Sequence, residues 1–473
     1  MTSRRARRRH PRVRFAAVPL LVAGVAVATG ACGPPPVVVE GDLAFVNVNV
    51  VPMDSERVIE GQTVVIDEGR IRSIDNAEHV EPAEGVEIVE ADGHYLVPGL
   101  TEMHGHLPDP RMSDQDIGNL LFLYVANGVT TVRGMQGDPS QFGLRSSIER
   151  GLLLGPQLYL ASVSMSGRSV ATPEEASRLA RGYQVEGYDL IKTHEGLARE
   201  VYEALVASAS EAGIPFGGHV PDSVGLLDAL AAGQISIDHL DNYVEALVPE
   251  DARDDDGGGL LAAGALVDRV DEGRIPELVQ ATVDAGAWVV PTMVLWETAF
   301  FGDRPSDDIR AERPEVRYMP PETVERWSEA VDSRLEGSDP EANRRVAALR
   351  RRILAALQEG GARIALGTDS PQIFSVPGFA MHHEMALYVD VGMTPYEVLE
   401  IGTRRPAEYF DAADEFGTVA LDRRADLILL AANPLEDIAN LRQRAGVVVG
   451  GRWLPESEIQ SRLTEIARFY GND

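Results

Sequence analysis

Cysteine is almost absent from this chain of 473 residues, since Cys32 is the only one. A single cysteine excludes an intramolecular disulfide. Basic residues are also scarce: 43 Lys and Arg face 74 Asp and Glu, and the formal net charge is −31. This acidity argues against nucleic acid as a partner, because a polyanion is bound by clustered positive charge. Apolar residues make up 44% of the chain, which is enough for a globular enzyme.

The N-terminal segment differs in composition from the rest of the chain. An arginine-rich start precedes an apolar run at residues 15–31, which is followed by Cys32 and three prolines. This pattern predicts a secretory signal over residues 1–32, because the run is slightly short for a membrane span. Thr29-Gly30-Ala31-Cys32 resembles a bacterial lipoprotein processing site, although the usual Leu is Thr29 here; a plain signal with an incidental cysteine is the alternative. We therefore expect export to the periplasm or cell envelope, lipidation of Cys32 as a membrane tether, and a linker at residues 33–42.

Strand-like alternation occurs near both ends of the mature chain, at residues 43–98 and 413–473. Neither piece is long enough to bury much apolar surface by itself, so we expect both to form one small β-sandwich, with a helix at the C-terminus. The stretch between them, residues 99–412, alternates short apolar strands with helical patterns. The eight strand candidates of this α/β pattern are YLVPGLTEM, GVTTVRGM, PQLYLASVSM, DLIKTH, PFGGHV, SIDHL, AWVVPTMV and RIALGTDS.

Eight such units in series predict a (β/α)8 TIM barrel, whose catalytic side chains lie at the C-terminal ends of its strands. Two longer segments, residues 245–273 and 300–344, follow strand candidates and are expected to be insertions at that same end of the barrel. The first is rich in Asp and Gly and reads as a mobile surface loop.

Several residues that can bind metals stand at predicted strand ends. His104 and His106 are two residues apart, so both face one side of the first strand. His219, His239 and Asp369 end three further strands. Each has an ordinary structural explanation when taken singly, but five such residues at four strand ends indicate a metal site.

Lys192 is the only lysine in the chain, and it ends the strand DLIKTH. Arginine serves at every other basic position, so this position requires something that arginine lacks. A desolvated lysine can become a neutral amine, whereas arginine stays protonated. A neutral amine can add CO2 to form a carbamate that offers two oxygens to two metals. Chance survival in an arginine-biased sequence is the alternative.

The motifs VPGLTEMHGHL, DLIKTHEG, GGHV, IDHL and GTDS together resemble the binuclear branch of the amidohydrolase superfamily. The stretches GVTTVR, MHHEMALYVDVGMTPYEVLEIGTRRPAEYF and ADLILLAANPLEDI are similar to its imidazolonepropionase-like and prolidase-like members. The resemblance implies two divalent metals, with zinc preferred over Mn or Fe. By resemblance, His104, His106 and Asp369 hold one metal, His219 and His239 hold the other, and carboxylated Lys192 bridges them with a hydroxide. Asp369 would act as general base and then as general acid.

The expected reaction is metal-dependent hydrolysis of an amide bond in a small molecule, such as a dipeptide or an N-acyl amino acid. Lactone opening and cyclic-amide opening remain alternatives on the same site, and a non-catalytic binding protein of the cell envelope is an alternative of another class. An oligomer is compatible with the sequence. The candidate substrate contacts are His194, Arg133, Arg168 and the pair His382-His383.

Overall fold

The computed structural model describes residues 36–252 and 263–472. The predicted signal and Cys32 lie outside these described residues. Among the described helices, none is both long enough and apolar enough to cross a membrane.

The described strands form four sheets, of eight, five, three and two strands. Their bounds are β1 Val37–Val39, β2 Leu43–Val50, β3 Ile59–Asp67, β4 Arg70–Asn76, β5 Val80–Pro82, β6 Glu87–Glu90, β7 Tyr95–Pro98, β8 Leu100–Gly105, β9 Val129–Gly134, β10 Gln157–Leu160, β11 Ile191–Thr193, β12 Phe216–Gly218, β13 Ser236–Asp238, β14 Trp288–Val290, β15 Arg363–Ile364, β16 Leu427–Leu430, β17 Arg444–Val449 and β18 Arg452–Pro455.

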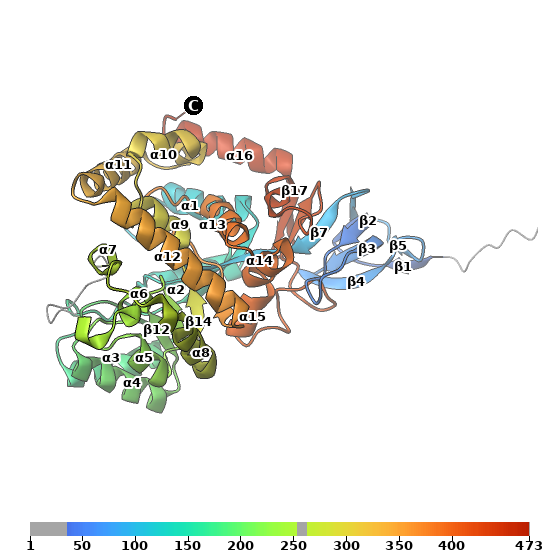
Figure 1. Ribbon diagram of the computed structural model, residues 1–473. Coiled ribbons are helices and arrows are strands. Elements are labelled where there is room, and N and C mark those ends of the chain that lie inside the picture. Colours follow the sequence, from blue (N-terminus) through green and yellow to red (C-terminus); the bar gives the residue numbers. More distant parts are fainter. Residues whose placement is uncertain (1–35, 253–262, 473) are drawn as a thin grey trace, which may run out of the picture.

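Helices connect most of the central strands and cover them on the outside (Figure 1). The α-helices are α1 Asp114–Ala126, α2 Gln141–Glu149, α3 Pro173–Glu186, α4 Arg199–Ala212, α5 Leu226–Ala231, α6 Tyr243–Leu247, α7 Ala263–Leu266, α8 Ile275–Ala285, α9 Met293–Leu295, α10 Ser306–Glu312, α11 Pro321–Glu336, α12 Pro340–Glu359, α13 Phe379–Asp390, α14 Pro395–Gly402, α15 Arg404–Tyr409 and α16 Glu456–Phe469. The short helices are η1 Glu250–Ala252, η2 Glu272–Arg274, η4 Pro314–Tyr318 and η5 Ile438–Arg442, all 3-10, and the π-helix η3 Trp296–Phe300.

The eight-stranded sheet joins the two ends of the chain, as expected. Its order is β18-β17-β16-β7-β2-β3-β4, with β6 also paired to β2. Phe45 of β2 contacts Trp453 of β18 edge to face, with ring centroids 5.2 Å apart. Three strands lie between β2 and β18, so this contact shows that the sheet curves strongly. The apolar side chains of its concave face form one core. The predicted β-sandwich would need a second large sheet packed on this one. Apart from the central strands, the described residues contain only the two-stranded sheet β1-β5 in addition.

Part of the predicted linker at residues 33–42 is a strand. Val37–Val39 forms β1, which pairs in parallel with β5, and Val37 N–H donates to the His79 carbonyl over 2.7 Å. The chain is part of the fold from Val37 onward.

All eight predicted central strands are present as β8 to β15, and every pair among them is parallel. They lie in the sheets β10-β9-β8 and β11-β12-β13-β14-β15. Parallel bridges Ala161 to Leu190 and Met165 to Thr193 join β10 to β11. On the other side, a parallel bridge from Gly105 to Ser370 joins the end of β8 to the segment that follows β15.

Local sequence signals explain where the covering helices begin and end. Thr172 caps α3 by accepting from Glu175 N–H, Pro173 opens the helix, and Gly187 ends it in the left-handed region at φ 90°. The segment 300–344 contains such signals too and is mostly helical, with Pro321 and Pro340 each opening a helix. The described part of segment 245–273, which was predicted to be a surface loop, also contains short helices.

Candidate active site

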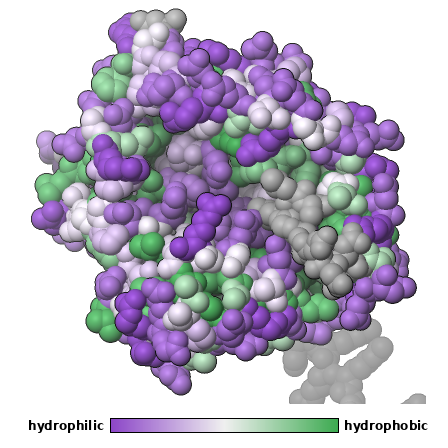
Figure 2. Space-filling model, turned by 90° about the vertical axis from the view of Figure 1, so that its left-hand side faces the viewer, coloured by the Kyte–Doolittle hydropathy of each residue, from purple (hydrophilic) through white to green (hydrophobic). Residues whose placement is uncertain are grey.

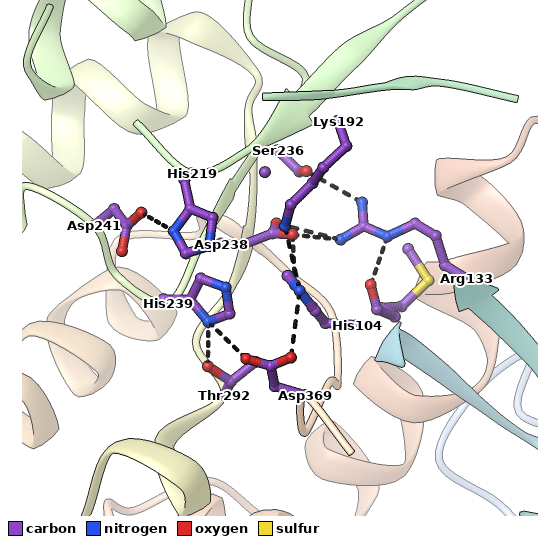
Figure 3. A network of polar contacts seen from close by, with 12 residues as sticks. His104, Arg133, Lys192, His219, Ser236, Asp238, His239, Asp241, Thr292 and Asp369 are labelled. Atoms are coloured by element: carbon purple, nitrogen blue, oxygen red, sulfur yellow. Dashed lines mark hydrogen bonds and ion pairs between the residues drawn. The ribbon is translucent and has the colours of Figure 1, made fainter. Parts of the chain in front are cut away.

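The carboxyl ends of the parallel strands bring the predicted site residues together (Figure 3). Each residue lies at the C-terminal end of a central strand or in the segment that follows it. The side chains meet there because parallel strands all end on one side of the sheet. The residues are His104 of β8, His106 after it, Lys192 of β11, His219 after β12, His239 after β13 and Asp369 after β15.

Three of these residues form a tight cluster. His106 Nε2 lies 2.9 Å and His104 Nε2 lies 3.7 Å from Asp369 Oδ1. One ligand atom from each of the three residues lies within 4.8 Å of the other two. Lys192 Nζ lies 3.3 Å from His104 Nε2, so the lysine adjoins the same cluster.

The remaining two histidines extend the cluster. The ring of His239 lies between those of His104 and His219, with centroid distances of 4.4 Å to each. Its Nε2 atom is buried and has no hydrogen-bond partner among the described residues. A buried polar atom without a partner is costly, so this nitrogen is built to receive a ligand.

Burial sets the protonation of these groups. It lowers the pKa of His219 to about 3 and the pKa values of His104 and His239 well below the usual range. Neutral imidazoles keep a lone pair for coordination. Burial also lowers the pKa of the Lys192 amine, although Asp238 and Asp369 oppose that shift. The protonation equilibrium of Lys192 is therefore shifted toward the neutral amine that its sequence context predicts.

Polar contacts within the chain hold the three buried imidazoles by their Nδ1 atoms. His104 Nδ1 lies 2.7 Å from Asp238 Oδ2, and His219 Nδ1 lies 2.7 Å from Asp241 Oδ2. His239 Nδ1 lies 2.7 Å from Thr292 Oγ1. Anchoring at Nδ1 leaves Nε2 as the atom available to a ligand, and it fixes the orientation of each ring.

Asp238, Asp241 and Thr292 were not predicted from the sequence as parts of the site. The two aspartates flank His239 in the motif SIDHLDN, which was a usable signal, whereas no sequence pattern connects Thr292 to His239.

Glu102 is a further residue that was not predicted from the sequence. It is fully buried, and its carboxylate accepts from the backbone N–H groups of His104 and Thr368 over 2.9 and 2.8 Å. Burial raises its pKa to about 7, although the hydrogen bonds from Thr368 and His104 oppose the shift. Glu102 thus ties the end of the first central strand to the segment that carries Asp369.

The backbone is strained at the same place. His239, Thr292 and Asp369 have φ values of 62°, 47° and 61°, a region that non-glycine residues rarely adopt. Such strain is concentrated at functional sites, where the surrounding structure enforces it.

Arg133 does not contact the cavity, which corrects the prediction that it binds substrate. Its side chain is 0% exposed, and its Nη2 lies 2.9 Å from Asp238 Oδ2. Nη1 donates to Ser236 Oγ and Tyr409 OH over 3.1 and 2.9 Å. Internal partners occupy the guanidinium, and its positive charge keeps Asp238 ionised beside His104.

Replacing Arg133 with Met should destabilise the protein by about 3–5 kcal/mol, because it leaves the buried Asp238 carboxylate without its partner. Urea unfolding would measure the loss. Arg304→Met is the matched control, because Arg304 pairs with Glu312 at the surface and such pairs contribute only about 0–1 kcal/mol. Equal stability of the two variants would contradict this role for Arg133.

Of the other predicted substrate contacts, one lies in the cavity lining and the rest lie outside it. His194 lines the cavity, its ring centroid lies 4.3 Å from that of His219, and its Nδ1 accepts from Glu195 N–H over 2.8 Å. Arg168 is exposed and is not among the residues that line the cavity. His382 is buried in α13 away from the cavity, and His383 contacts Glu315 over 2.7 Å. Arg168, His382 and His383 thus lie outside the described cavity lining, and their substrate contacts stay predictions.

A cavity of about 580 Å³ opens above the cluster. Beyond the site residues, one part of its lining is apolar and aromatic, from Leu295, Trp296 and Phe300. Polar side chains of Gln136, Ser164, Glu195 and Gln372 line the rest. This volume suits a small molecule. Figure 2 shows a predominantly hydrophilic face that is hollowed near its centre.

Known proteins share this sequence pattern and this fold. Residues 95–454 match the amidohydrolase family. Adenine deaminase 2 of Desulfotalea psychrophila (strain LSv54 / DSM 12343) is 28% identical over 233 residues, which are 45% of this chain and only 38% of that protein. A solved bottromycin amidohydrolase has a TM-score of 0.69 at 24% identity and covers 91% of both chains. A Xaa-Pro dipeptidase structure with bound methionine has a TM-score of 0.63 at 19% identity, over 87% of this chain and 99% of that one.

The solved structures share the fold with this protein, and the family match extends over well more than half of the chain. The chain therefore belongs to the amidohydrolase family.

Proposed function

We propose that the protein is a two-metal hydrolase that cleaves an amide bond in a small molecule. One observation supports this proposal most directly. Five imidazole and carboxylate side chains, with Lys192 beside them, line the cavity at the ends of the central strands. Family membership supports the hydrolytic chemistry.

We infer that strands β8 to β15 close as a (β/α)8 barrel over residues 99–412. The bridges between β10 and β11, and between the end of β8 and the segment that follows β15, support closure on both sides of the two parallel sheets. The companion domain would comprise residues 43–98 and 413–473, which share the eight-stranded sheet.

The donor set fits metal ions. His104, His106 and Asp369 would hold one ion, and His219 and His239 would hold the second, with the unpartnered Nε2 of His239 directed to it. Zinc suits this mixture of imidazole and carboxylate best. When bound, such ions lower the pKa of water and polarise a substrate carbonyl.

Lys192 would join the two metal positions as an N6-carboxylated lysine. Its amine is 2% exposed and lies 3.3 Å from His104 Nε2, and burial favours the neutral form that reacts with CO2. A carbamate on this amine would present two oxygens toward the imidazoles.

Asp369 would carry the proton in the reaction. Its carboxylate faces the cavity from a strained backbone position next to His106. As general base it would accept a proton from the attacking water, and as general acid it would deliver that proton to the departing amine. The apolar wall of Leu295, Trp296 and Phe300 would hold the substrate side chain and keep water out.

Dipeptides and N-acyl amino acids are the proposed substrates, and lactones and cyclic amides are the alternatives to test beside them. A cavity of about 580 Å³ accommodates any of them. The similar proteins include an adenine deaminase and a Xaa-Pro dipeptidase, so deaminase substrates belong in the same screen.

Metal analysis combined with a substrate screen tests the proposal. We expect about two divalent ions per chain, loss of activity with a chelator and its return with Zn²⁺, Mn²⁺ or Fe²⁺. The screen would use Xaa-Pro, Xaa-Arg and N-acyl amino acid libraries. A metal-loaded protein that hydrolyses no amide, lactone or cyclic amide would contradict the proposal and favour a binding protein of the cell envelope.

Export and a lipid tether at Cys32 are a separate proposal, which rests on the N-terminal sequence alone.

A further inference from the structure

Glu195 is a cavity-lining carboxylate that the proposed chemistry does not use. It lies three residues beyond Lys192, outside the set of proposed metal ligands. Its Oε1 atom is buried and has no hydrogen-bond partner among the described residues. A buried carboxylate oxygen without a partner costs free energy, so a ligand that donates to it would be stabilised.

The backbone holds Glu195 in a fixed place. Its N–H group donates to His194 Nδ1 over 2.8 Å, and its carbonyl accepts from Gly167 N–H over 3.0 Å. Behind Gly167 there is no room for a side chain, since an added Cβ would lie 2.0 Å from the carbonyl oxygen of Gly196. The carboxylate therefore projects from a preorganised segment, as a specificity group should.

Glu195 supplies the acidic charge of the described cavity lining outside the proposed metal ligands. Among the described lining residues, the acidic side chains are Glu195 and Asp369, and the only lysine or arginine is the buried Lys192. Glu195 forms no ion pair with a basic side chain within the described structure. Burial raises the pKa of its carboxyl group, while the charges of Arg168 and Lys192 lower it, so a bound ammonium would further stabilise the ionised form. The rings of Trp296 and Phe300 line the same cavity and are compatible with a cation in it, because aromatic faces attract positive charge.

We propose that Glu195 binds a protonated amine of the substrate and so selects amides that carry an ammonium group close to the scissile bond. This inference rests on the proposed function and narrows it. A dipeptide with a free α-amino group has such an ammonium, whereas an N-acyl amino acid does not. Glu195 is thus assigned as the residue that separates the two proposed substrate classes.

The kinetic test uses the best dipeptide found in the screen and its des-amino analogue, which differs only by the ammonium group. An ion pair with charge-assisted hydrogen bonds should give the wild type a preference of about 10- to 100-fold in kcat/KM for the dipeptide. Glu195→Gln should reduce that ratio toward one, mainly through a higher KM for the dipeptide. Glu195→Asp keeps the charge and should retain part of the preference.

Glu174→Gln is the matched control, because it removes the same charge at an exposed position in the first turn of α3. It should keep the wild-type ratio. If Glu195 were merely structural, Glu195→Gln would lower kcat/KM for both substrates equally, which would overturn the proposal. A wild type that shows no preference for the ammonium would overturn it as well.

A binding measurement keeps the test independent of turnover. Calorimetry would compare leucinamide with its uncharged counterpart 4-methylpentanamide on the metal-loaded enzyme. We expect leucinamide to bind about 10-fold tighter or more, and Glu195→Gln to remove the difference. Equal binding of the two amides would refute the role of Glu195, even if no amide is hydrolysed. Failure of the proposed function alone would instead appear as ammonium-selective binding without hydrolysis.

Discussion

Lys192→Arg should be as inactive as Lys192→Ala, even though it preserves the positive charge. Neither variant can form a carbamate, because arginine stays protonated and alanine has no amine. Both should lose about 10³-fold or more in kcat/KM, the scale of losing a group that stabilises charge in the transition state. Metal content should fall in both, because the bridge between the two positions is gone.

Chemical rescue separates these two variants. Short carboxylic acids should partly restore Lys192→Ala by occupying the vacated space between the metals, whereas the arginine side chain would fill that space and prevent rescue. Metal content and kcat/KM would be measured with and without added acetate or propionate, and thermal unfolding would verify that each variant is folded. An arginine variant with near-normal metal content and turnover would show that the lysine is not carboxylated for function.

Asp369→Asn should lower kcat by about 10²- to 10⁴-fold, because an amide cannot accept the proton of the attacking water or return it to the leaving amine. Some metal should also be lost, since Asp369 Oδ1 lies 2.9 Å from His106 Nε2 within the proposed ligand cluster. Saturating the assay with metal separates the two effects: it should restore occupancy and leave kcat low.

Asp307→Asn is the control for that change, because Asp307 is an exposed residue in the first turn of α10. It should match the wild type in metal content and turnover. A fully active Asp369→Asn enzyme at wild-type occupancy would remove Asp369 from the proton-transfer role and leave it as a ligand at most.

The sequence predicted the central strands and the cluster well, for a physical reason. Parallel strands buried on both faces are short apolar runs, and their ends lie on one side, so a polar residue such as His219 or Asp369 stands out after its run. Lys192 was visible from composition alone, because arginine occupies every other basic position.

The partners of the cluster could not be predicted in the same way. Arg133 lies at a strand end like the histidines, and only the folded structure shows that Asp238, Ser236 and Tyr409 occupy its guanidinium. The pairing of His239 with Thr292 joins two strands and likewise leaves no local pattern. The helices in segment 300–344, in contrast, could have been predicted from the sequence, because Pro321 and Pro340 are local signals for the start of a helix.

The sheet shared by the two chain ends has a consequence for biosynthesis. β7 pairs with β16, so Pro98 must wait for Leu427 to leave the ribosome before this contact can form. At a synthesis rate of about 5–20 residues per second, the interval is tens of seconds. During that time the hydrogen-bonding edge of β7 has no partner from β16 and is open to pairing with another chain. Delayed closure of this sheet should make the nascent protein dependent on holding factors, and more prone to aggregate when translation stalls before β16.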